Sequence, residues 1–243
     1  GGILHDDLKR EGVDVSHLKE EAGGTGTVIV LVDETSQRTM LSFRGVNVKL
    51  APEEIPREYI ARSRLLHVSG YSLTHRPQSD AALIAMKHAR EADVRVSLDP
   101  SPHIHLARRK VIASALRLTD LLLPDYPETR YLSGKNNVRQ AGKVLLKKGA
   151  SIVATKLGGN GCLVMTRDEE FRVFAFKVKT ADTTGAGDAY DAGFVVGQLR
   201  GWDLSRSAVF ANAVAALKTM RMGARTGLPG IDEVEKFMQH EHK

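Results

Sequence analysis

The sequence predicts an α/β domain in which a mostly parallel sheet is covered by helices on both faces. Apolar, β-branched runs alternate with amphipathic helical segments through the middle of the chain, which is typical of a parallel sheet. A hairpin pattern on each side of this alternation indicates antiparallel edge strands. The 243 residues contain no internal repeat, low-complexity segment or linker, so we expect one domain over residues 1–243.

The predicted elements follow in order along the chain. Each strand is a short apolar run rich in β-branched residues, and each helix repeats its apolar residues every three or four positions. Turn clusters, prolines and glycines separate these runs. The first half contains strands at 27–32 and 39–43 joined by a turn at 33–37, a strand at 65–70, a helix at 78–92, a strand at 94–99, a helix at 105–116 and a strand at 118–123. The second half contains a helix at 138–148, strands at 151–155, 161–165 and 170–176 with a turn at 166–169, and helices at 187–199, 205–220 and 232–239.

The N-terminus is unusual for a complete domain. The chain has no initiator Met, and residues 6–12 are similar to the second half of a helix that ends at a glycine C-cap. The first residues contain neither the basic region nor the apolar region of a signal peptide. We therefore expect an N-terminally incomplete domain.

The composition excludes several classes of protein. A single cysteine, Cys162, rules out an internal disulfide framework and a cysteine-based zinc site. Lys and Arg number 35 against 29 Asp and Glu, and this excess is spread along the chain without interleaved aromatics. No apolar run approaches the length of a membrane span. We expect a cytoplasmic protein with a small-molecule partner and no nucleic-acid or membrane partner.

The ends of the predicted strands indicate where a ligand binds. In open α/β sheets, ligands lie beyond the carboxyl ends of the strands. The segments that follow the strands, or that precede a helix at the same edge, are 69–74, 99–102, 124–128, 156–161 and 183–188.

The small-residue segment at 181–189 is the most informative of these. Gly185 and Gly187 precede a predicted helix, so backbone amides at its N-terminus can face an anion such as a phosphate. Asp188 lies in the first turn beside this anion site, where a carboxylate can take a proton from a hydroxyl. The acidic residues could instead only cap the helix, and the spacing alone leaves that alternative open.

The helix after this segment carries small residues on one face. Ala189, Gly193 and Gly197 are four residues apart, and the next predicted helix is rich in alanine. This spacing predicts two helices that pack closely, whatever the function.

Residues 182–189, with the sequence DTTGAGDA, resemble the C-terminal signature of the ribokinase-like (PfkB) carbohydrate kinases. Other segments resemble the same family in order and spacing: the nucleotide loop at 155–162, two segments near the adenine at 210–213 and 221–224, a strand end at 98–100 and a loop at 45–50. The resemblance covers nearly the whole chain. It implies a ribokinase-like fold with a largely parallel, Rossmann-like sheet, antiparallel edge hairpins and lid strands that are at least partly missing.

The resemblance implies ATP-dependent transfer of the γ-phosphoryl group to a sugar hydroxyl, with Asp188 as the general base. By position it implies an anion hole at Gly185, Ala186 and Gly187, nucleotide binding at Lys156, Gly158, Gly159, Gly161 and Asn212, and a monovalent cation such as K⁺ at Asp182 and Thr184. Neither a P-loop nor the protein-kinase motifs are present. ATP, Mg²⁺, a sugar and a second copy of the chain are the implied partners.

One motif departs from the family pattern. Asp125-Tyr126-Pro127-Glu128 stands where the family usually has Asn-x-x-Glu near the Mg²⁺-bound phosphates. Glu128 fits a magnesium site, either directly or through water. Asp125 either joins it as a metal ligand or is only a turn residue ahead of the proline.

The acceptor is the least defined part of the prediction. Arg44, Asn47 and Asp99 are candidates for contacts with the sugar, although Arg44 and Asn47 could equally be surface-loop residues. Ribose, fructose or 2-keto-3-deoxygluconate are the acceptor types that the resemblance suggests. A nucleoside kinase of the same fold and a noncatalytic binding relative are the alternatives.

Overall fold

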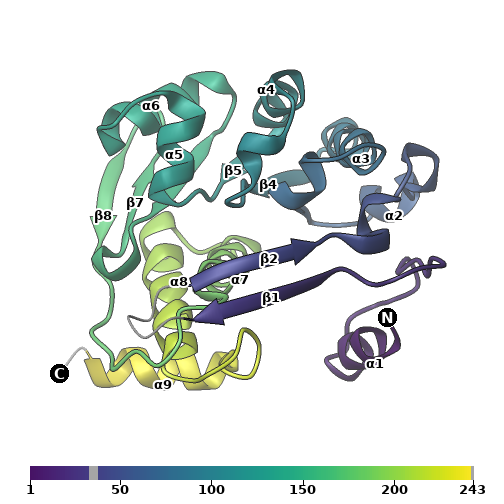
Figure 1. The fold of residues 1–243 in the computed structure, drawn as a ribbon. Coiled ribbons are helices and arrows are strands. Elements are labelled where there is room, and N and C mark those ends of the chain that lie inside the picture. Colours follow the sequence, from purple (N-terminus) through teal and green to yellow (C-terminus); the bar gives the residue numbers. More distant parts are fainter. Residues whose placement is uncertain (33–37, 242–243) are drawn as a thin grey trace.

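The computed structural model describes residues 1–32 and 38–241, and within them the main element is a six-stranded sheet (Figure 1). Its strands lie in chain order: β3 (Leu65–Ser69), β4 (Arg95–Asp99), β5 (Leu121–Leu122), β6 (Ile152–Lys156), β7 (Cys162–Met165) and β8 (Glu170–Val173). Strands β3 to β6 are parallel, and β7 and β8 form an antiparallel hairpin at one edge. The predicted α/β class and the second hairpin are therefore confirmed.

Helices cover both faces of this sheet. Helices α3 (Gln78–Glu91), α4 (Arg109–Leu118) and α6 (Val138–Lys148) lie on one face, and α7 (Ala186–Leu199) and α8 (Leu204–Thr219) lie on the other (Figure 1). Alternation along β5 divides the core between the faces. Leu122 packs with the α3–α4–α6 side, whereas Leu121 and Leu123 pack with the α7–α8 side. The remaining helices are α1 (Gly2–Arg10), α2 (Arg57–Ala61), α5 (Tyr126–Ser133) and α9 (Ile231–Glu241).

The first hairpin does not extend the main sheet. Strands β1 (Thr27–Val32) and β2 (Arg38–Phe43) pair only with each other, with Thr27 opposite Phe43. The turn predicted at 33–37 lies outside the described residues. Both strands were predicted from their apolar residues, but several of these side chains are solvent-exposed, including Ile29 and Phe43. A β-branched run predicts a strand, and it carries no information about which sheet the strand joins.

Three predicted boundaries are wrong. The helix predicted at 105–116 is a 3₁₀ turn at Ile104–Leu106 followed by α4, because the backbone of Arg108 is extended. The strand predicted at 118–123 is reduced to Leu121–Leu122, because α4 continues through Leu118. The strand predicted at 170–176 ends at Val173, because its partner strand β7 begins opposite it at Cys162.

Helices α7 and α8 pack as closely as the glycine spacing predicts. A Cβ added to Gly193 would lie 2.8 Å from the Cα of Ala211, and one added to Gly197 would lie 2.6 Å from Ser207 Oγ. Both distances are too short for a real Cβ, so these helices can approach only with glycine at these positions.

We expect Gly193→Val to lower the free energy of unfolding by about 1–3 kcal/mol, the usual cost of overpacking a core. Urea denaturation measures this change. Gly2→Val in α1 is the matched control, because a Cβ there would meet nothing within 4 Å. Equal stability of Gly193→Val and the parent protein would show that the two helices can separate at no cost.

Candidate active site

Two cavities meet at the carboxyl edge of the sheet. The larger cavity has a volume of about 980 Å³ and is lined by residues from all five segments expected at the strand ends. The smaller cavity has a volume of about 610 Å³ and lies against α7 and α8. Lys156, Gly158, Thr183 and Gly187 line both cavities. A group held by these four residues is therefore accessible from either side.

Asp188 follows Gly187 in the first turn of α7 and lines the larger cavity. Gly185 caps the helix with φ of +78°, and a Cβ on it would lie 2.8 Å from the Ala224 carbonyl oxygen. The first amides of a helix have no partner one turn earlier, so they are available to an anion. The Ala186 amide differs from its neighbours because it already donates to the Thr183 carbonyl at 3.1 Å. In this conformation the predicted anion hole therefore rests on the Gly185 and Gly187 amides.

The surroundings of Asp188 favour proton uptake. Partial burial raises the pKa of its carboxyl above the usual aspartate value, and the nearby Asp99 carboxylate raises it further. The Lys156 ammonium acts in the opposite direction and lowers it. A carboxylate with a raised pKa is a stronger base than an ordinary aspartate.

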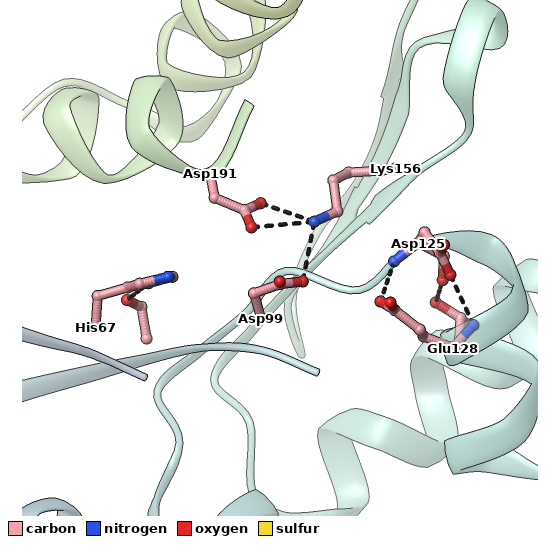
Figure 2. A network of polar contacts seen from close by, with 8 residues as sticks. His67, Asp99, Asp125, Glu128, Lys156 and Asp191 are labelled. Carbon is pink, nitrogen blue, oxygen red and sulfur yellow. Dashed lines mark hydrogen bonds and ion pairs between the residues drawn. The ribbon is translucent and has the colours of Figure 1, made fainter. Parts of the chain in front are cut away.

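Lys156 lies at the centre of a buried ion cluster (Figure 2). Its Nζ donates to both Asp191 carboxylate oxygens at 3.0 Å and to Asp99 Oδ1 at 3.1 Å. Burial lowers the pKa of the Lys156 ammonium, but the two carboxylates outweigh this effect and hold that pKa above its usual value. A Cβ on Gly187 would lie only 3.6 Å from Nζ, so this fixed positive charge stands beside the helix N-terminus.

Asp191 is a site residue that sequence reasoning missed. It is 2% exposed and lies on α7, one helical turn after Asp188. The signal was present in the sequence, because an aspartate among Ala189, Tyr190 and Phe194 on a buried helix face requires a cation partner. The identity of that partner was not predictable, because Lys156 is 35 residues away along the chain.

Asp125 and Glu128 form a reciprocal capping box at the start of α5. Glu128 N donates to Asp125 Oδ1, and Asp125 N donates to Glu128 Oε2, both at 2.8 Å (Figure 2). Asp125 is thus a helix cap. An aspartate followed three residues later by a glutamate is the sequence signal for such a box; this signal was present at 125–128 but was interpreted only as a metal site or a turn, so helix α5 was not predicted. Burial raises the pKa of Asp125, and it raises that of the 5% exposed Glu128 to about 7.

The capping box is still compatible with Mg²⁺. It uses one oxygen of each carboxylate, and both residues line the larger cavity. Mg²⁺ is commonly held by one or two carboxylates, with phosphate oxygens and waters completing its coordination. No cluster of three metal-binding side chains occurs in the described residues.

The predicted nucleotide loop surrounds the smaller cavity. Gly158, Gly159, Gly161 and Asn212 all line it. Gly161 has φ of +83°, and a Cβ on it would lie 1.9 Å from the Val173 carbonyl oxygen, so only glycine fits there. The Asn212 amide donates to the carbonyls of Val173 and Phe174 at 3.2 and 3.1 Å. Asn212 therefore holds the wall of the cavity with its nitrogen.

Asp182 and Thr184 lie close together, and the ammonium group of Lys218 lies beside them. Asp182 Oδ1 accepts from the Thr184 amide and Oδ2 from the Gly223 amide, both at 2.9 Å. The Lys218 Nζ donates to the Asp182 backbone carbonyl at 2.9 Å. The hydrogen bonds from Thr184, followed by smaller contributions from Gly223 and Lys218, hold the pKa of the Asp182 carboxyl at about 2.

The three acceptor candidates differ in position. Asp99 lines the larger cavity, and Arg44 places its guanidinium 4.9 Å from the ring centre of Tyr71, which also lines it. Asn47 is instead packed against Gly26. Tyr71 was missed as a residue, although its segment was among those expected at the strand ends. Met40 of β2 lines the same cavity, so the separate two-stranded sheet contributes to the site.

A small-molecule kinase is the class of enzyme that this arrangement serves, because phosphoryl transfer depends chiefly on positioning and on charge stabilisation. Residues 1–231 match the pfkB family of carbohydrate kinases, and the chain belongs to this family. An uncharacterized sugar kinase from Archaeoglobus fulgidus is 35% identical over 231 residues, which are 94% of this chain and 90% of that protein.

Solved structures agree with the family. An E. coli protein described as a ribokinase II, in complex with ATP and Mg²⁺, superposes with a TM-score of 0.88 at 25% identity and covers 99% of this chain and 79% of its own. A double mutant of the Vibrio cholerae fructokinase, with fructose, ADP and a potassium ion bound, superposes with a TM-score of 0.85 at 25% identity. The match covers 97% of this chain and 80% of the fructokinase chain. The chain is an ATP-dependent sugar kinase. Within residues 1–32 and 38–241, none of the helices has the length and apolarity to cross a membrane.

Proposed function

We propose that Asp188 is the general base of this kinase and that the acceptor is a neutral sugar or a sugar acid. The observation that carries the proposal is the position of Asp188 on the wall of the larger cavity, directly after Gly187, which lines both cavities. A nucleotide in the smaller cavity can direct its terminal phosphate to Gly187, while an acceptor in the larger cavity presents its hydroxyl to Asp188. Both reactants then meet beside the N-terminus of α7.

The surrounding residues supply the charge stabilisation in this proposal. Asp188 takes the proton from the acceptor hydroxyl as the oxygen attacks the phosphorus. The amides of Gly185 and Gly187 and the dipole of α7 stabilise the transferring phosphoryl group. Lys156 adds a fixed positive charge beside them. Gly158, Gly159 and Gly161 leave room for the nucleotide backbone to approach.

Glu128 and Asp125 would hold Mg²⁺ through their remaining oxygens, either directly or through water. The ion would neutralise charge on the phosphates. This role is compatible with the capping box, because the cap keeps both carboxylates fixed at the cavity wall.

The larger cavity suits a polyhydroxyl acceptor better than a nucleoside. Two of its carboxylates, Asp99 and Asp188, are left to accept hydrogen bonds from hydroxyls. The Tyr71 ring is already packed against Arg44 and His103, at 4.9 and 5.2 Å, so it is poorly placed to stack on a base. A homodimer that covers exposed apolar residues of β1 and β2, and a cytoplasmic location, complete the proposal.

A phosphorylation assay with ATP and a panel of acceptors tests the acceptor class. We expect turnover on at least one of ribose, fructose and 2-keto-3-deoxygluconate, and much less on adenosine. ADP production without any acceptor is the background control. Adenosine as the preferred acceptor would establish the nucleoside alternative instead.

A further inference from the structure

We propose that Lys218 replaces the monovalent cation at the anion-hole loop, so that this kinase works without K⁺. The proposal rests on the proposed role of residues 182–187 as that loop. Lys218 is 0% exposed, and its ammonium donates to the Asp182 backbone carbonyl at 2.9 Å. A backbone carbonyl oxygen that accepts from an ammonium already has a cation beside it.

The other polar groups around Asp182 are also engaged by the protein. Its two carboxylate oxygens accept from the Thr184 and Gly223 amides. Its own amide and that of Ala181 donate to the Thr219 carbonyl at 3.0 and 2.7 Å. Residues from α8 and from the segment after it thus hold this loop without an added ion.

A buried lysine next to this loop also opposes a second cation. An ion bound to the Asp182 carbonyl would lie close to the buried Lys218 ammonium, and the two like charges would repel each other. The donor set around Asp182 and Thr184 therefore does not fit K⁺ in this chain. In this proposal, Lys218 takes the place of the monovalent cation expected at these two residues.

The position of Lys218 gives it a role in catalysis through the loop. Asp182 lies three residues before Gly185, whose amide begins the anion hole. A positive charge on the Asp182 carbonyl holds the backbone between the end of α8 and the start of α7. Lys218 is thus a positioning residue for the amides that face the phosphoryl group.

Two measurements on the parent enzyme test the proposal. With Tris-neutralised ATP, we expect turnover to differ less than twofold between KCl, NaCl and tetramethylammonium chloride at equal ionic strength. We also expect the same melting temperature in the three salts. A tenfold or larger activation by K⁺, or a K⁺-specific rise in melting temperature, would overturn it.

The Lys218→Met variant tests the residue directly. We expect turnover to fall at least tenfold in tetramethylammonium chloride and to recover on addition of K⁺, with a K⁺-specific rise in melting temperature. Lys147→Met, at an exposed position on α6, is the matched control and should respond to no salt. A folded Lys218→Met variant that ignores K⁺ would show a purely structural lysine and refute the proposal.

The failure of this proposal can be told apart from the failure of the proposed function. If the Lys218→Met variant does not fold, the salt comparison on the parent enzyme still decides whether the kinase needs K⁺. If the parent enzyme phosphorylates no acceptor in any salt, the proposed function fails, while the melting temperatures still decide whether K⁺ binds.

Discussion

Asp188→Asn is expected to reduce kcat by about 10²–10⁴-fold, the usual contribution of a general base, while ATP binding changes little. Asn has nearly the same shape as Asp but cannot accept the proton. The amides of Gly185 and Gly187 and the Lys156 ammonium remain, so the phosphate contacts persist. Steady-state kinetics gives kcat, and calorimetric titration with ATP gives the affinity.

The pH dependence of the parent enzyme provides a second readout of Asp188. The base must be deprotonated, so kcat/KM falls as the pH falls through the pKa of Asp188. Burial and Asp99 raise this pKa, so the midpoint of the fall in kcat/KM on the acidic side of the pH profile should lie above the pKa of an ordinary aspartate. Asp168→Asn, on the exposed turn between β7 and β8, is the control and should leave kcat and the acidic side of the pH profile unchanged. An unchanged kcat in Asp188→Asn would remove Asp188 from the chemical step.

Lys156→Met is expected to lower the free energy of unfolding by about 3–5 kcal/mol, because it leaves the buried Asp191 carboxylate without its partner. The Lys156 and Asp191 side chains are only 13% and 3% exposed, so water cannot replace the lost contact. The Asp99 carboxylate lines the cavity and regains solvent more easily. Chemical denaturation measures the loss.

A double variant separates stability from catalysis. Lys156→Met with Asp191→Leu removes both charges, and we expect it to recover most of the stability that the single variant loses. Its turnover should stay low, because no positive charge remains beside Gly187. Full activity of the double variant would show that Lys156 serves only the fold. Parent-like stability of the single variant would show that Asp191 is not charged in the folded protein.

Much of the fold could be predicted because its signals are local. The helix at 138–148 has the predicted boundaries, and α3, α7 and α8 lie within two residues of theirs. Errors occurred where a boundary depends on contacts that are remote in sequence. The strand predicted to reach residue 176 ends at Val173, because its partner β7 begins opposite it at Cys162. Asn212, on a helix nearly forty residues later, then binds the carbonyls of Val173 and Phe174.

The sequence by itself was enough to predict the segment that we propose for phosphoryl transfer, because Gly185, Gly187 and Asp188 are neighbours in one turn and their chemistry needs no distant partner. Only the tertiary structure decided how the charges pair. Lys156 joins Asp99 from 57 residues away and Asp191 from 35, and Lys218 reaches Asp182 across 36. These contacts depend on the order of the strands and on the packing of α8 against α7. Neither can be read from local patterns, because a strand or helix pattern specifies which face is buried but not which neighbour buries it.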